Sequence, residues 1–275
     1  MKLKKIYRFD NKRQIWRIIP ANNDKLIIEE RELEKKQAYF HCLVLDSGKK
    51  LFNNLQFKEK FWIGIETVRG DIIFFHKFAK PDMPKHRGIF AFDISSQKIL
   101  WENAELIFLF LSKEKLYAFR EKFEGRNYYS INPLNGETLE EIGEDYDLIK
   151  NLKKESLIEE NCKGYLFPEV FETDNITDNR ANDLIKSLRN NFVISGKIEY
   201  ILKNELLLVS FHNVNSKGNF NNLFKAVDLS TGKYILEAII NNETSLYLTD
   251  SFFLKDNFLF LLFGKTRLEV YKIIN

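Results

Sequence analysis

The sequence predicts an all-β fold, and its composition and internal repetition carry that prediction. Aromatic residues make up 14% of the chain, with 25 Phe and 11 Tyr beside only 12 Gly and 5 Pro. Aromatic and β-branched side chains favour pleated, half-buried surfaces. Short apolar runs also recur along the whole chain at a spacing of about 46 residues, which is typical of a repeat architecture.

The first repeated pattern is an apolar run, a short polar turn and a second apolar run. The second runs lie at residues 26–28, 72–75, 116–119, 165–167, 206–209 and 258–262. Paired runs around a tight polar turn are typical of β-hairpins. Because their apolar character is continuous rather than alternating, we expect these strands to be covered on both faces.

The second pattern lies between those hairpins and joins two strands by a turn that contains Asp or Asn. Copies lie at residues 43–51, 89–101, 129–137 and 226–235. Asp and Asn side chains bond nearby backbone N–H groups, and glycines such as Gly136 and Gly232 supply the left-handed turn residue. Two hairpins per repeat give four antiparallel strands, the content of a propeller blade. The sequence therefore predicts a six-bladed β-propeller in which residues 1–275 form a single domain.

Four of these blades carry a familiar repeat. Residues 90–101 and 226–233 resemble the repeat of quinoprotein-type (PQQ-like) β-propellers, with Asp93 and Trp101 or Asp228 and Gly232 at the matching positions. The repeat is also WD40-like, and the whole chain resembles a bacterial family of propeller-like cytoplasmic proteins of unknown function. The resemblance implies the fold. Quinone-dependent members of the PQQ-like group hold a calcium-bound quinone and often have adjacent cysteines, which this chain lacks, so we expect no cofactor.

The two ends of the chain predict how the ring closes. Residues 268–273 give the last blade a third strand, and residues 6–9 are expected to add the fourth, which removes an exposed sheet edge. Blade four is irregular, because residues 171–179 are polar and residues 182–189 have the apolar spacing of a short helix. A five-bladed ring with an inserted segment is the alternative.

Targeting signals and charge predict a cytoplasmic protein. Residues 1–10 are basic but lack the apolar run and cleavage site of a secretory signal. Cys42 and Cys162 lie far apart without CxxC spacing, so we expect two reduced thiols. The 42 basic and 39 acidic side chains are intermixed, a pattern that does not favour nucleic-acid binding. The longest apolar stretch is too short to span a bilayer, so no membrane partner is expected.

A ring of polar residues is the candidate binding site. Polar side chains follow the second apolar run in most repeats, where such strands lead to the loops of one propeller face. The long loops are expected at residues 79–88 and 213–222, after the strands that end with His76 and His212. The candidates are Glu30, His76, Arg120, Glu169 and His212. The alternative interpretation is that each strand becomes polar where it reaches water.

Other chemistry is weakly indicated. Lys80 and the run Lys85-His86-Arg87 form a small basic cluster, which we interpret as a solvated loop rather than a phosphate site. No two of the four histidines share metal-ligand spacing on one strand or helix, so no metal site is expected. The sequence contains no GxSxG, no HExxH and no phosphate-binding glycine loop, so no catalytic residue is assigned.

These observations favour a binding or scaffold module that recognises a protein or a small ligand on one face. The supporting feature is a repeat architecture without a catalytic constellation. The alternative function is a propeller-type hydrolase or lyase that uses the polar ring, with a histidine as general base. A third interpretation has the protein join a larger assembly through an exposed apolar patch.

Overall fold

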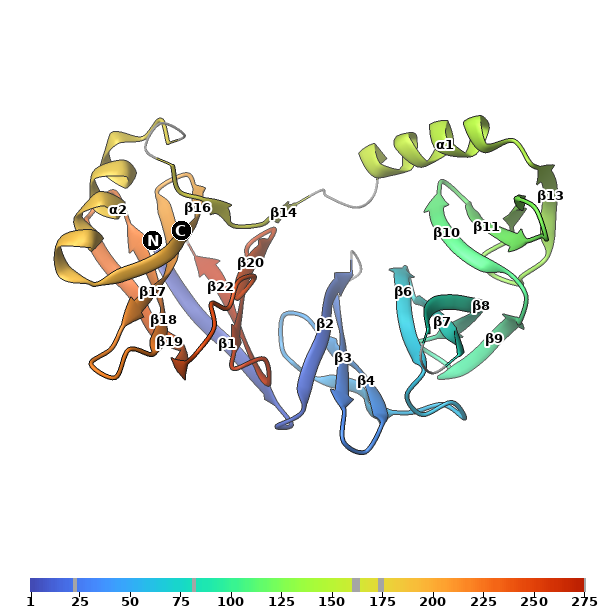
Figure 1. Cartoon of the computed structure of the whole chain (residues 1–275), viewed down its shortest axis with the longest axis horizontal. Helices are drawn as coiled ribbons and strands as arrows, with labels where there is room; N and C mark the ends of the chain where they lie inside the picture. The colour runs from blue at the N-terminus through green and yellow to red at the C-terminus, as the bar shows by residue number, and fades with distance from the viewer. Residues whose placement is uncertain (22–23, 81–82, 160–163, 173–175, 275) are drawn as a thin grey trace. The chain divides into compact units, whose positions relative to one another are not determined.

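The computed structural model describes residues 1–21, 24–80, 83–159, 164–172 and 176–274. Within them the chain is all-β, with five antiparallel sheets of four or five strands and two helices (Figure 1). The chain divides into two compact units. Unit 1 combines Met1–Lys12 with Gly164–Asn275, and unit 2 is Arg13–Lys163. A single domain over the whole chain stays a prediction.

Unit 2 contains three four-stranded sheets, in each of which consecutive strands are neighbours. The first consists of β2 (Gln14–Ala21), β3 (Lys25–Glu32), β4 (Gln37–Val44) and β5 (Lys50–Leu55). The second consists of β6 (Ile63–Arg69), β7 (Ile72–Lys80), β8 (Met83–Asp93) and β9 (Lys98–Asn103). The third consists of β10 (Ile107–Ser112), β11 (Lys115–Glu121), β12 (Arg126–Ile131) and β13 (Thr138–Gly143). The hairpins expected in this part of the chain are therefore confirmed.

Phenylalanines fill the space between the first two sheets of unit 2. Phe75 and Phe90 stack with their ring centroids 4.9 Å apart, and Phe40 of the first sheet meets Phe75 edge-on at 4.9 Å. Phe57, from the connection between the sheets, lies 5.0 Å from both Phe75 and Phe90. Each such pair contributes about 0.5–1.5 kcal/mol beyond the burial of its area. The high aromatic content of the sequence thus serves packing between adjacent sheets.

Helix α1 (Tyr146–Glu159) follows the third sheet and was not among the predicted elements. Asp145 precedes it and accepts a hydrogen bond from the Leu148 backbone N–H at 2.9 Å, which favours a helix start. Ile149, one turn into the helix, is buried in a cluster with Phe110 and Tyr117 of the third sheet. The helix therefore covers apolar side chains that the sheet alone would leave exposed.

Unit 1 contains two five-stranded sheets. One has the order β15 (Glu169–Val170), β16 (Ile194–Lys203), β17 (Leu206–Val214), β18 (Phe220–Asp228) and β19 (Lys233–Thr244). The other has the order β1 (Lys2–Asp10), β22 (Arg267–Ile274), β21 (Phe258–Phe263), β20 (Phe252–Lys255) and β14 (Tyr165–Leu166). The N-terminal strand pairs with the C-terminal strand, with Phe9 opposite Leu268, and this predicted pairing is confirmed.

The prediction of six blades is wrong for the described part of the chain, which contains five sheets. The apolar run at 165–167 does not form a separate sheet. Strand β14 pairs with β20, and β15 pairs with β16, so both short strands extend the sheets of unit 1. Pro168 separates them, and proline cannot donate a hydrogen bond within a sheet. The alternative of five sheets with an inserted segment fits this arrangement.

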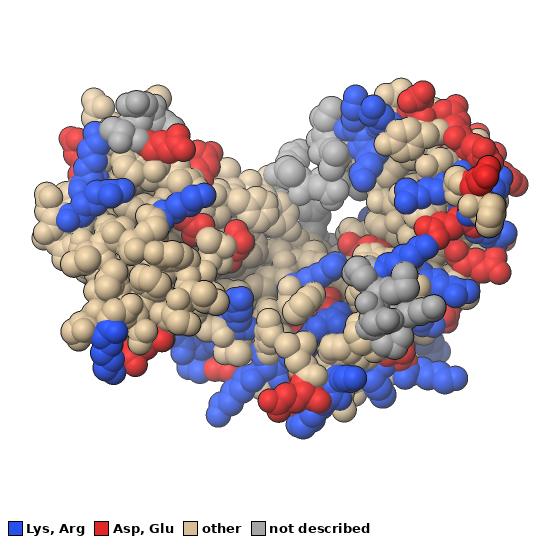
Figure 2. Space-filling view, in the orientation of Figure 1, with Lys and Arg blue, Asp and Glu red and all other residues tan. Residues whose placement is uncertain are grey.

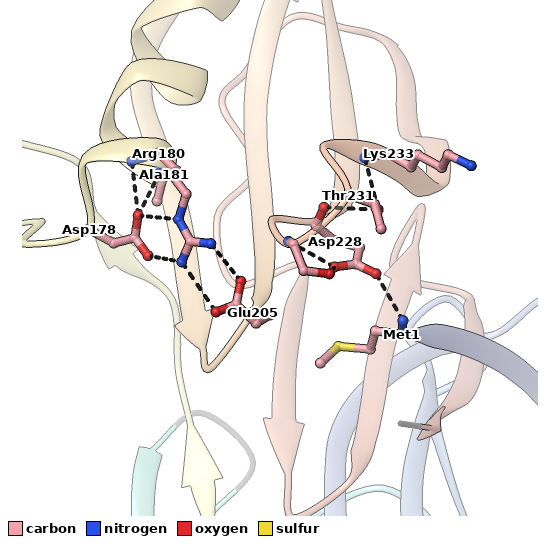
Figure 3. A network of polar contacts seen from close by, with 9 residues as sticks. Met1, Asp178, Arg180, Ala181, Glu205, Asp228, Thr231 and Lys233 are labelled. Carbon is pink, nitrogen blue, oxygen red and sulfur yellow. Dashed lines mark hydrogen bonds and ion pairs between the residues drawn. The ribbon is translucent and has the colours of Figure 1, made fainter.

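The inserted segment contains helix α2 (Asn179–Asn191). The helix expected at 182–189 is therefore confirmed, and the observed helix is longer at both ends. Asp178 caps its start, because its carboxylate accepts hydrogen bonds from the backbone N–H groups of Arg180 at 2.9 Å and Ala181 at 3.3 Å (Figure 3). The Arg180 side chain contacts both Asp178 and Glu205, which lies in the turn between β16 and β17. Its Nη1 is 2.9 Å from Oε2 of Glu205. The helix is thereby tied to the sheet that it covers.

The turns follow the sequence patterns, but two connections are shorter than expected. Gly136 and Gly232 have φ of 76° and 68°, as their turn positions require. The loops expected at 79–88 and 213–222 are largely strand, because β8 begins at Met83 and β18 begins at Phe220. The interpretation of residues 85–87 as a loop is therefore wrong, because they belong to β8.

The helices, the cysteine thiol and the surface charge bear on the environment of the chain. Neither described helix is long and apolar enough to cross a membrane. Cys42 is a buried thiol outside any disulfide, and burial raises its pKa to about 12, whereas Cys162 lies outside the described residues. On the face shown in Figure 2, basic and acidic side chains are interspersed with uncharged ones.

Candidate functional site

The five predicted site residues fall into both units. Glu30 lies on β3, His76 on β7 and Arg120 on β11, so three successive sheets of unit 2 each contribute one. Glu169 lies on β15 and His212 on β17, in unit 1. Convergence of all five on one site therefore stays a prediction, and each unit is described by itself.

Glu30 lies on the face of its strand opposite the second sheet. Its Oε2 is 3.0 Å from Nε2 of buried His41 and 3.3 Å from Nη1 of Arg13. The preceding residue, Glu29, accepts a hydrogen bond at 3.4 Å from the backbone N–H of Ile65 on β6. Because consecutive strand residues point to opposite faces, Glu30 projects away from the sheet that carries His76.

His76 instead belongs to a compact cluster within the second sheet. Oε1 of Glu66 on β6 lies 3.0 Å from Nδ1 of His76 on β7 and 2.7 Å from Nδ1 of His86 on β8. The two imidazoles are stacked, with centroids 3.5 Å apart and planes 8° from parallel. We call Glu66, His76 and His86 the Glu–His–His cluster.

Irregularities in the strand pairing bring these side chains together. On β6, Ile65 pairs with Phe75 and Thr67 with Phe74, so Glu66 is the extra residue of a β-bulge. On β8, a second register shift falls at Gly88, which has a φ of 72°. Bulges redirect side chains and occur often beside functional sites. Here the first presents Glu66 to the histidines of the two following strands.

Burial differs sharply within the cluster. The side chain of His76 is 1% exposed and that of Glu66 is 11% exposed, whereas that of His86 is 33% exposed. Gly64 makes room for the buried ring, since a Cβ at this position would lie 2.9 Å from both Cε1 and Nε2 of His76. Within the described residues, neither ring nitrogen of His76 makes a hydrogen bond of good geometry.

Electrostatics keep the carboxylate of Glu66 ionised. Burial by itself would raise the pKa of Glu66, but the adjacent imidazoles of His76 and His86 outweigh it and hold that pKa at about 2. Burial lowers the pKa of His76, and the carboxylate of Glu66 only partly opposes this. The cluster therefore combines a charged carboxylate with a neutral buried imidazole at neutral pH.

An ion pair borders the cluster on its other side. Nη2 of Arg31 donates hydrogen bonds to Oε1 of Glu29 and to the Ile63 carbonyl, both at 2.6 Å. The second of these bonds connects the first sheet to the second. The same Nη2 lies 3.5 Å from the Cβ position at Gly64. Arg17 approaches Glu29 at 3.9 Å, so one carboxylate faces two guanidinium groups.

A pocket with a volume of about 390 Å³ adjoins the exposed side of the cluster. His86 lines it together with Lys85, Arg87, Glu105, Arg120 and Glu121. Arg120 and Glu105 form an ion pair at 2.7 Å, and Lys85 contacts Glu121. Arg87 is exposed and has no ion-pair partner among the residues that the structure describes. His86 therefore belongs to both the pocket and the cluster, and Arg120 is the predicted site residue that reaches this pocket.

The two predicted residues of unit 1 have local partners. Nε2 of His212 accepts a hydrogen bond from the Leu248 backbone N–H at 3.0 Å, and burial lowers the pKa of His212. Glu169 accepts a hydrogen bond from the hydroxyl of Tyr200 at 3.2 Å. Both contacts fix neighbouring segments of unit 1.

Glu66 and the role of His86 were not predicted. These three residues lie on three adjacent strands, so they show no metal-ligand spacing along a single strand or helix. A usable signal existed: Glu66, His76 and His86 follow one another at equal intervals across two successive hairpins. The bulge that selects Glu66 depends on strand pairing and has no clear sequence mark.

The fold and the site define an all-β protein whose unit 2 combines a Glu–His–His cluster with a basic pocket. Residues 19–101 match the family model described as a domain of unknown function, DUF4905. That segment includes all three members of the cluster. No curated protein matches the chain.

Solved structures give only distant similarity. One is a putative exo-β-1,3-galactanase from Bifidobacterium bifidum s17, with 10% identity, a TM-score of 0.31, and coverage of 100% of this chain and 94% of that one. A eukaryotic initiation factor has 9% identity, a TM-score of 0.35 and coverage of 95% and 55%. A complex of KlAtg21 with the coiled coil of AgAtg16 has 6% identity, a TM-score of 0.30 and coverage of 91% and 67%.

Proposed function

We propose that this chain is a cytoplasmic binding module and that unit 2 recognises a small ligand bearing a carboxylate or phosphate group. The ligand occupies the pocket whose charged and histidine side chains are Lys85, His86, Arg87, Arg120, Glu105 and Glu121. The volume of this pocket, about 390 Å³, lies within the range of small-molecule sites. The observation that carries the proposal is Arg87, an exposed cation in this pocket without an ion-pair partner among the described residues.

Arginine suits this role because its planar guanidinium bonds an oxyanion through two N–H groups at once. Arg120 is engaged by Glu105, but both side chains are about half exposed or more, at 50% and 61%. An exposed ion pair contributes little stability, so a ligand oxyanion can replace Glu105 at small cost. Two guanidinium groups are then available to one anion.

A thermal-shift titration with small carboxylates and phosphates tests the proposal. Binding to the folded state alone stabilises it by about 2.7 kcal/mol at a ligand concentration 100 times Kd. We expect at least one oxyanion to raise the melting temperature of the wild type and to lose most of that effect in Arg87→Gln. Arg189→Gln, an exposed arginine in α2 of unit 1, removes the same charge and should keep the effect.

Two outcomes would refute the proposal. One is that no carboxylate or phosphate stabilises the wild type. The other is that Arg87→Gln and Arg189→Gln weaken binding equally, which would indicate nonspecific attraction to net positive charge.

We also propose that the five sheets are blades of a β-propeller of the PQQ-like or WD40-like repeat type. Support comes from the consecutive antiparallel strand order of each sheet and from the pairing of β1 with β22, which joins the two ends of the chain. Small-angle scattering tests this: a closed ring requires a compact particle, and an extended two-unit profile would refute it.

A hydrolase or lyase is the second candidate, and one contact favours it. Glu66 bonds Nδ1 of His86 at 2.7 Å, and the same histidine lines the pocket. A carboxylate that orients an imidazole is the usual arrangement of a general base. Turnover of simple chromogenic esters or phosphoesters that disappears in His86→Gln would support an enzyme. Oxyanion binding without turnover would support the binding module.

A further inference from the structure

We infer that the Glu–His–His cluster binds a divalent transition-metal cation of the zinc class. One carboxylate oxygen and two imidazole nitrogens, one from each side chain, lie within 4.8 Å of one another. Two histidines and one carboxylate form a common ligand set for zinc and for non-haem iron. This site adjoins the oxyanion pocket and shares His86 with it.

The buried histidine is the strongest evidence. Its side chain is 1% exposed, and neither ring nitrogen has a hydrogen bond of good geometry within the described residues. A buried polar group that lacks a hydrogen bond destabilises the folded state. Nδ1 of His76 lies 3.0 Å from Oε1 of Glu66 in poor hydrogen-bond geometry, and a metal bound at Nδ1 would replace this contact with a bond to each side chain.

The local charge also permits a cation. Glu66 contributes a carboxylate to the cluster, and the nearby Arg31 forms an ion pair with Glu29 at 2.6 Å. Arg17 lies 3.9 Å from the same Glu29.

Binding requires one movement. A metal bonds in the plane of an imidazole, and two parallel rings 3.5 Å apart share no in-plane point. One ring must therefore turn out of the stack. His86 is free to do so, since a third of its side chain is exposed, whereas His76 is enclosed and faces Gly64.

Equilibrium dialysis of the metal-free full chain against zinc tests the inference. We expect one bound zinc per chain, and we expect His86→Gln and Glu66→Gln each to weaken binding more than about tenfold, which is the least that losing an outer-shell partner gives. Glu34→Gln removes an exposed carboxylate from the turn between β3 and β4 of unit 2 and should leave zinc binding unchanged. Thermal melting without zinc identifies any variant that fails to fold.

Zinc binding by the wild type tests the inference even if a variant does not fold. If it binds no zinc at micromolar free concentration, the inference is overturned. It is also overturned if folded His86→Gln or Glu66→Gln binds zinc as tightly as the wild type. Because dialysis contains no oxyanion ligand, its failure leaves the proposed binding function intact, and failure of the oxyanion titration leaves the zinc inference intact.

Discussion

The imidazole of His76 stacks on that of His86 with centroids 3.5 Å apart, and both rings turn Nδ1 toward the same oxygen of Glu66. One ring is buried, and the other lines the pocket beside Arg120. The pair therefore connects the interior of the second sheet of unit 2 with the surface where we place ligand binding.

Gly64→Ala should disturb this cluster directly. The new Cβ would lie 2.9 Å from two ring atoms of His76, and overpacking of this kind costs about 1–3 kcal/mol. Urea unfolding measures the loss. In a His76→Ala background, where the ring is absent, the same change should cost much less. Equal costs in the two backgrounds would show that His76 does not occupy the space at Gly64.

Gly232→Val tests the turn between β18 and β19. Gly232 has a φ of 68°, and no atom lies within 4 Å of a Cβ at this position, so the cost comes from the backbone alone. A left-handed conformation costs a residue with a Cβ about 1–2 kcal/mol. The neighbouring exposed residue provides the control, Lys233→Val. A variant Gly232→Val that unfolds at the same urea concentration as this control would contradict the turn conformation.

Deletion of residues 1–10 should destabilise unit 1 far more than loss of an unstructured tail. Strand β1 pairs along β22 from Lys2 to Asp10, and Phe9 is 3% exposed. Removal of one buried phenylalanine side chain costs about 3–5 kcal/mol. Phe9→Ala should reproduce much of the loss, whereas Lys4→Ala, an exposed position on the same strand, should not. A truncated chain that melts with the wild type would rule out a structural role for β1.

Asp228 should make folding stability sensitive to acid. The N-terminal ammonium of Met1, at 2.8 Å, and the hydroxyl of Ser230, at 2.6 Å, lower its pKa to about 2 (Figure 3). Because the folded pKa is below the usual 3.8, the contribution is complete above about pH 5 and is lost as the pH falls through 3.8 toward 2.

Urea unfolding of the wild type and Asp228→Asn at several pH values measures this contribution. The difference between the two proteins should be constant above pH 5 and shrink toward pH 2. Asp46→Asn, at an exposed aspartate in the turn between β4 and β5, serves as the control. A difference that does not change with pH would show that the carboxylate of Asp228 is unpaired.

Most of the fold was predictable because its signals are local. Paired apolar runs around polar turns gave the hairpins, and glycines such as Gly136 and Gly232 marked left-handed turns. The number of sheets was not predictable from local signals. The run at 165–167 has the apolar character of a strand, but only its pairing with β20 assigns it to a sheet of unit 1.

The candidate site was less predictable, because it depends on contacts across strands. His76 and Arg120 were identified by their positions after apolar runs, and Arg120 reaches the pocket. Glu66 sits at a bulge, and His86 was placed in a loop that is in fact strand β8. Residues brought together by pairing register leave no spacing pattern on a single strand.

Anomalous diffraction at the zinc absorption edge, from crystals of the full chain grown with zinc, tests the central claim most directly. The account predicts an anomalous peak bonded to a carboxylate oxygen of Glu66 and to Nδ1 of both His76 and His86, with the His86 ring turned out of the stack. Crystals that show the two rings still stacked, with zinc peaks only elsewhere on the molecule, would contradict it.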